Sequence, residues 1–157
     1  MIGLVLALFV GMCIGAFLFD KMTAKSFFYV ETQNRKLYIL YKLMFHWVLE
    51  KQKGRNLTDY LIERDYKSIA IYGMNYVGQA LMGEIFNRGI TVKYGIDQNA
   101  DDIFTDVKIY KPIDNLEAVD VVVVTPITHF EQIKKVLSEK MKCPIISIED
   151  LVYDIRV

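Results

Sequence analysis

The sequence after residue 65 alternates between short β-branched runs and amphipathic segments, and this alternation restricts the folds open to the chain. The run Val121-Val122-Val123-Val124 is β-branched on both faces, which is typical of strands buried in a parallel sheet. Strand and helix in alternation predict an α/β fold, a parallel doubly wound sheet with right-handed crossovers. The expected strands are 68–72, 90–96, 107–110, 120–125 and 144–148, and the expected helices are 76–88 and 128–140.

The N-terminal segment carries no charged side chain from Met1 to Phe19. A helix rises about 1.5 Å per residue, so a run of this length spans a hydrocarbon core of roughly 30 Å. A cleaved signal peptide would need a basic region before the apolar run, and nothing basic precedes Ile2. Lys21 and Lys25 follow the run, so the positive-inside rule predicts a single-pass helix in the inner membrane with the rest of the chain in the cytoplasm.

A second helical segment is expected between this anchor and the sheet. The stretch from Thr23 to Lys53 lacks Gly and Pro and has an amphipathic spacing, and Gly54 should end it. A short helix is expected from about Asn56 to Arg64, capped by Asn56 or Thr58. The sequence thus predicts an anchor over 1–20, a juxtamembrane helical segment over 21–65 and an α/β domain over 66–157.

Charge is distributed unevenly along the chain. Residues 20–56 contain eight Lys and Arg against three acids, and residues 57–157 contain eleven against sixteen. A basic stretch beside the anchor suits an anionic lipid leaflet. The acidic remainder argues against a nucleic acid as partner.

The turn Gly73-Met74-Asn75-Tyr76-Val77-Gly78 follows a predicted strand and opens a predicted helix. A dinucleotide fingerprint reads G-x-G-x-x-G at this place. Gly73 and Gly78 fit its first and third glycines, while Asn75 stands at the second, where a phosphate comes closest to the backbone. The turn is therefore predicted to bind a nucleotide through residues 73–78, and the alternative is a purely structural strand-to-helix turn.

Asp97 ends the second predicted strand, where an acid would accept hydrogen bonds from ribose hydroxyls. An acid there repels a 2′-phosphate, so NAD or a UDP-sugar is favoured over NADP as the cofactor. The alternative interpretation of Asp97-Gln98-Asn99 is an ordinary turn.

Thr125 ends the strand 120–125, and Pro126 and His129 follow it. All three should face the same ligand, because ligands of open α/β sheets lie outside the carboxyl ends of the strands. Thr128 is predicted to cap the next helix, with Glu131 completing a capping box. No residue pattern identifies a catalytic group or a metal site.

The domain resembles the Rossmann-like domain of bacterial polysaccharide-biosynthesis proteins, similar to the N-terminal domain of sugar acyltransferases and the nucleotide-binding-like domain of phosphoglycosyl and glycosyl transferases. The residues that carry the resemblance are Ile71-Tyr72-Gly73 with Gly78, Tyr94-Gly95-Ile96-Asp97, the strand into Thr125-Pro126, and Cys143-Pro144-Ile145-Ile146-Ser147-Ile148. The resemblance implies a nucleotide-sugar ligand and a glycosyltransferase or other envelope-glycan enzyme as partner. In the acyltransferases a separate domain performs the chemistry, and we expect no such domain in this sequence.

Three functions are compatible with these patterns. The first is a membrane-anchored module that binds a nucleotide or nucleotide-sugar for envelope polysaccharide biosynthesis. The second is an NAD-dependent oxidoreductase or epimerase that uses His129. The third is a ligand-free scaffold for membrane assembly, in which Gly11 and Gly15 would form the face of a homodimer.

Overall fold

The computed structural model describes residues 2–86 and 88–154, except for the side chains of residues 2 and 4–9. The chain divides into two compact units, Met1–Lys42 and Leu43–Val157. The boundary lies inside the segment predicted over 21–65, because the side chains of Leu43 and Trp47 are buried in the second unit.

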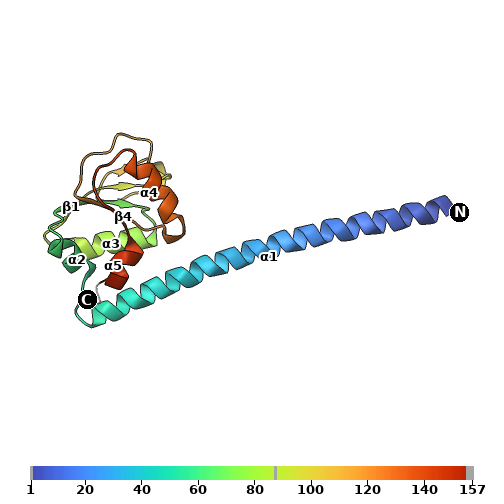
Figure 1. Ribbon diagram of the computed structural model, residues 1–157, viewed down its shortest axis with the longest axis horizontal. Coiled ribbons are helices and arrows are strands. Elements are labelled where there is room, and N and C mark those ends of the chain that lie inside the picture. Colours follow the sequence, from blue (N-terminus) through green and yellow to red (C-terminus); the bar gives the residue numbers. More distant parts are fainter. Residues whose placement is uncertain (1, 87, 155–157) are drawn as a thin grey trace. The chain divides into compact units, whose positions relative to one another are not determined.

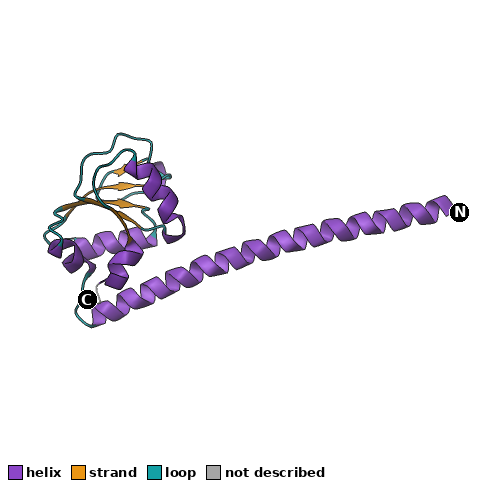
Figure 2. Ribbon diagram, viewed as in Figure 1, coloured by secondary structure: helices purple, strands orange, loops and turns teal. Residues whose placement is uncertain are grey.

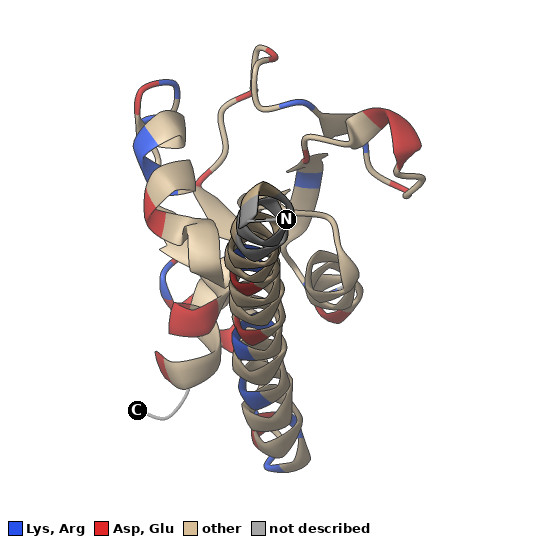
Figure 3. Cartoon of the chain, turned by 90° about the vertical axis from the view of Figure 1, so that its right-hand side faces the viewer, with Lys and Arg blue, Asp and Glu red and all other residues tan. Residues whose placement is uncertain are grey.

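The first helix, α1, is continuous from Ile2 to Gln52 (Figure 1). The sequence predicted two helical segments here, and the helix passes from one to the other without a break. Its charged residues begin at Asp20 and follow along the rest of the helix (Figure 3). As predicted, the helix ends before Gly54, which takes a φ of 79°.

None of the helices among the described residues has an apolar stretch long enough to cross a membrane. The span predicted over 1–20 is therefore not found there. Part of that prediction falls on Met1 and on the side chains of residues 2 and 4–9, which lie outside the described part of the chain.

A five-stranded sheet forms the centre of the second unit, with the order β3-β2-β1-β4-β5 and all neighbours parallel (Figure 2). This confirms the predicted parallel α/β fold. The chain adds β2 and β3 on one side of β1 and then returns to add β4 and β5 on the other side. The strands are β1 Ser68–Tyr72, β2 Thr91–Ile96, β3 Ile109–Tyr110, β4 Val121–Val124 and β5 Ile145–Ser147.

Strand β4 is the most deeply buried part of the sheet. All four of its valines have no exposed side-chain surface, which confirms the prediction of a strand covered on both faces. On one face Val122 and Val124 join a core with Leu137 of α4 (Phe130–Ser138). The helices α2 (Leu57–Glu63), α3 (Tyr76–Ile85) and α5 (Ile148–Asp154) lie on the opposite side of the sheet in Figure 1.

The start of one predicted helix differs from the prediction, and one further helix was not predicted. Thr128 lies in a 3-10 turn, η2 (Ile127–His129), and α4 begins after His129 without a side-chain cap, so the predicted capping box of Thr128 is wrong. Helix α5 was not predicted. The predicted cap Asn56 is confirmed, and its backbone N–H donates to the Asp59 carboxylate (3.1 Å).

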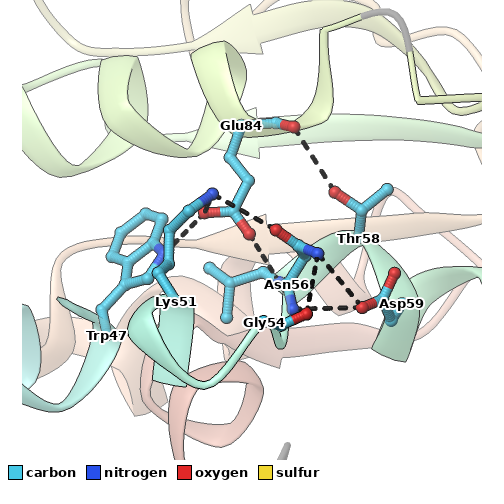
Figure 4. Close-up of polar contacts among 8 residues, drawn as sticks. Trp47, Lys51, Gly54, Asn56, Thr58, Asp59 and Glu84 are labelled. Atoms are coloured by element: carbon cyan, nitrogen blue, oxygen red, sulfur yellow. Dashed lines mark hydrogen bonds and ion pairs between the residues drawn. The ribbon is translucent and has the colours of Figure 1, made fainter. Parts of the chain in front are cut away.

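Two buried carboxylates hold the end of α1 and the start of α2 in place. The Glu84 carboxylate of α3 accepts hydrogen bonds from the Trp47 indole N–H (2.7 Å) and the Leu57 backbone N–H (2.6 Å), and pairs with Lys51 (3.2 Å) (Figure 4). The Glu50 carboxylate pairs with two cations beyond the end of the helix. A hydrogen bond from Lys53, supported by Arg55, holds the pKa of Glu50 below its usual range.

Candidate functional site

The carboxyl ends of β1, β2 and β4 meet around the turn between β1 and α3. Gly73 starts this turn with a φ of 89°, a conformation that favours glycine. A Cβ on Gly73 would lie 2.6 Å from the Thr125 hydroxyl and 2.7 Å from the Pro126 ring. The Thr125 hydroxyl donates to the Gly73 carbonyl oxygen (2.6 Å), so the end of β4 is fastened to the turn.

Asn75 caps helix α3 from inside the same turn. Its side-chain oxygen accepts hydrogen bonds from the backbone N–H groups of Val77 (3.0 Å) and Gly78 (3.4 Å). The residue at the second fingerprint position therefore occupies helix-terminal amides that would otherwise face a ligand.

Gly78 keeps α3 close to β1. A Cβ added at this position would lie 2.2 Å from the carbonyl oxygen of Gly73 and 3.5 Å from the Ile71 side chain. The third glycine of the motif thus performs the packing role that the fingerprint assigns to it.

Asp97 lies directly after β2, beside this turn. One carboxylate oxygen accepts the Met74 backbone N–H (2.9 Å), and the other accepts the Asn99 backbone N–H (3.0 Å). The carboxylate therefore connects the carboxyl ends of the two strands. A carboxylate has about four lone-pair positions, so acceptor capacity remains after these two bonds.

A cavity of about 570 Å³ opens at these strand ends. The turns after β1 and β2 provide most of its polar lining. Its apolar lining comes from α4 and the loops beside it, which also contribute the polar residues His129 and Gln132. The residues that line it are Tyr72, Gly73, Asn75, Asp97, Gln98, Asn99, Pro112, Pro126, His129, Gln132, Ile133, Val136 and Leu137. We refer to this cavity as the switch-point cleft, because it lies where the strand order reverses on the two sides of β1.

Tyr72 adds a neutral polar group to the cleft. Burial raises the pKa of its phenol. The hydrogen bond with Gln98 lowers this pKa, and the nearby carboxylate of Asp97 raises it. The hydroxyl therefore keeps its proton well above neutral pH.

The cleft brings together half of the predicted ligand-binding residues, namely Gly73, Asn75, Asp97, Pro126 and His129. The other predicted residues lie elsewhere. Met74 is buried, and its side chain lies where a Cβ of Gly95 would otherwise stand. The residues Val77, Gly78 and Thr125 are buried as well. The Tyr76 side chain is 87% exposed.

Sequence reasoning missed most of the apolar wall. Ile133, Val136 and Leu137 occupy one face of α4, and their i, i+3, i+4 spacing could have identified the face but not which surface it covers. Gln98 and Asn99 follow Asp97 directly and could have been included with it. Pro112 comes from the β3–β4 loop, whose path no sequence pattern indicates.

No family model, curated protein or solved structure matches this chain. The resemblance to polysaccharide-biosynthesis proteins therefore remains a prediction.

Proposed function

We propose that this protein binds a nucleoside-containing small molecule, such as a nucleotide or nucleotide-sugar, in the switch-point cleft. The observation that carries the proposal is the position of Asp97 at the end of β2, on the wall of a 570 Å³ cavity at the reversal of strand order. Open α/β sheets bind ligands at this place, and an acid at the end of the second strand accepts ribose hydroxyls.

The chemistry of the two walls supports a ligand with an apolar part and a hydroxylated part. Ile133, Val136 and Pro112 offer an apolar surface on which a flat base can lie. Asp97 and Asn75 offer acceptors and donors for sugar hydroxyls on the opposite wall. A cavity of a few hundred cubic ångströms that combines apolar surface with placed polar groups is typical of small-molecule sites.

A binding role is favoured over catalysis because the polar groups of the cleft already have structural tasks. The Asp97 carboxylate holds two backbone amides, and Asn75 caps α3. Both side chains are therefore engaged in holding the β1–α3 turn and the start of α3.

Replacement of Asp97 tests the proposal. Titration calorimetry of the full chain should detect binding of at least one of adenosine, uridine, their phosphates, NAD and UDP-glucose. Asp97→Ala should weaken that binding by about tenfold or more, because a charge-assisted hydrogen bond to a hydroxyl contributes about 1.5–3 kcal/mol. Lys142→Ala, an exposed change outside the cleft, should leave it unchanged. Failure of every compound to bind the wild-type chain would contradict the proposal.

We further propose that the chain binds its ligand while attached to the inner membrane. The charge-free sequence Met1–Phe19 and the cations after it support attachment of the chain to the inner membrane, with the cleft in the cytoplasm. The resemblance supports a partner in envelope polysaccharide biosynthesis. Carbonate extraction of cell membranes should leave the full chain in the pellet and release a variant that lacks residues 1–20. Release of the full chain would contradict membrane attachment.

A further inference from the structure

Three backbone amides of the β1–α3 turn already donate to side-chain oxygens of the protein. Met74 N–H donates to the Asp97 carboxylate, and the N–H groups of Val77 and Gly78 donate to the Asn75 side chain. These are the amides with which a strand-to-helix turn would hold a phosphate. A phosphate that uses these three amides must therefore displace an oxygen of Asn75 or Asp97.

The charge on the cleft wall also opposes a phosphate. Asp97 contributes a carboxylate directly at the turn. Among the described residues that line the cleft there is no Lys or Arg, and His129 is the one basic side chain. A phosphate ester in this cleft would face a like charge with at most one histidine to compensate it.

Two lysines near the β3–β4 loop have acceptors of their own. Lys111 pairs with Asp101, which raises the pKa of that lysine. The Lys140 ammonium donates to the carbonyl oxygen of Pro112 (2.6 Å). Use of either cation for a phosphate would break an existing contact.

From these contacts we infer that the switch-point cleft selects an uncharged nucleoside over its phosphate esters, and that Asn75 sets this preference at the turn. The inference rests on the proposed binding of a nucleoside-containing molecule. It narrows the ligand class to nucleosides without a phosphate group, and so disfavours the nucleotides and nucleotide-sugars. Neutral hydroxyls can still use the remaining lone pairs of Asp97 without displacing Met74 or Asn99. Asn75 is thus a specificity-determining residue.

Two matched ligand series test the inference on the full chain. Calorimetry with adenosine, AMP and ADP, and with uridine, UMP and UDP, gives the affinity ratio of nucleoside to monophosphate in the series that binds. We expect the monophosphate to bind about tenfold more weakly, because its charge lies close to Asp97. Because each ratio compares two ligands on the same protein, a general loss of stability cancels.

Two variants of Asn75 should move this ratio in opposite directions. Asn75→Gly frees the amides of Val77 and Gly78. It should lower the ratio of nucleoside affinity to monophosphate affinity by about threefold or more. Asn75→Asp keeps an oxygen for the cap, adds a negative charge and should widen the ratio. Circular dichroism checks that both variants fold.

The outcomes separate the inference from the proposed function. Binding of AMP or UMP at least as tight as that of the nucleoside overturns the inference and supports the proposed function. An unchanged ratio in Asn75→Gly overturns the role of Asn75. Binding of NAD or UDP-glucose with none of the six compounds bound also overturns the inference. Absence of binding by all six compounds, NAD and UDP-glucose overturns the proposed function itself.

Discussion

Replacement of Glu84 by alanine is expected to lower the free energy of unfolding by about 3–5 kcal/mol, since breaking a buried charged network leaves its partners uncompensated. The Glu84 side chain is buried, and its two oxygens accept the Trp47 indole N–H and the Leu57 backbone N–H (Figure 4). Without the carboxylate both donors remain buried without an acceptor, at a cost of about 1–3 kcal/mol each. Urea denaturation of the variant and the wild type measures the difference.

Control variants separate the hydrogen bonds from the loss of side-chain volume. Glu84→Gln keeps one acceptor oxygen and most of the volume, so its loss of stability should be smaller than that of Glu84→Ala. Glu139→Ala removes an exposed carboxylate from the end of α4 and should change stability by about 0.5 kcal/mol or less. Equal effects of Glu84→Ala and Glu139→Ala would show that the contacts of Glu84 do not stabilise the fold.

A double-mutant cycle tests the pairing with Trp47 directly. Trp47→Phe removes the indole donor and should cost stability on its own, because Trp47 is buried. In the background of Trp47→Phe, Glu84→Ala should cost less than in the wild type, because one of its two donors is already absent. Additive effects would contradict a direct coupling of the two side chains.

The sequence was sufficient to predict the sheet because its strands carry strong local signals. The four residues of β4 are all valines, and the last four residues of β1 are apolar or aromatic. Gly54 is a signal of another kind, since a glycine often takes the positive φ with which a helix ends. Helix α5 escaped prediction because it has only seven residues and begins directly after β5. Its start does carry a signal, since the Ser147 hydroxyl accepts the Glu149 N–H (3.1 Å).

The cleft was less predictable than the fold because its character depends on contacts between distant segments. The position of Asp97 at the end of the second predicted strand indicated that it would lie beside the turn. It did not indicate that Asp97 would bind the Met74 amide across two strand ends. The substitution at Asn75 was visible in the sequence as a departure from glycine. Its role as a cap that occupies two amides became clear only from the geometry of α3.

A second large change in the free energy of unfolding is expected at Gly78 of α3, with Gly83 of the same helix as the matched control. Gly78→Ala would place a Cβ 2.2 Å from the Gly73 carbonyl oxygen, a backbone atom that cannot move without shifting the β1–α3 turn. We expect a loss of about 2–4 kcal/mol, at or above the usual cost of overpacking, because backbone has to yield. Gly83→Ala meets no atom within 4 Å and should stabilise the protein by about 0.5–1 kcal/mol through helix propensity.

Both changes replace glycine by alanine in α3. The difference between their free energies of unfolding therefore measures the effect of the close contact between α3 and β1 at Gly78. Urea denaturation of the two variants gives this difference, and similar stabilities would contradict the packing assigned to Gly78. Ligand affinity adds a second comparison. A shift of the turn should also displace Asn75 and weaken binding in Gly78→Ala, whereas Gly83→Ala should bind like the wild type. The third glycine of the motif would then act on the ligand through the position of the turn, without touching it.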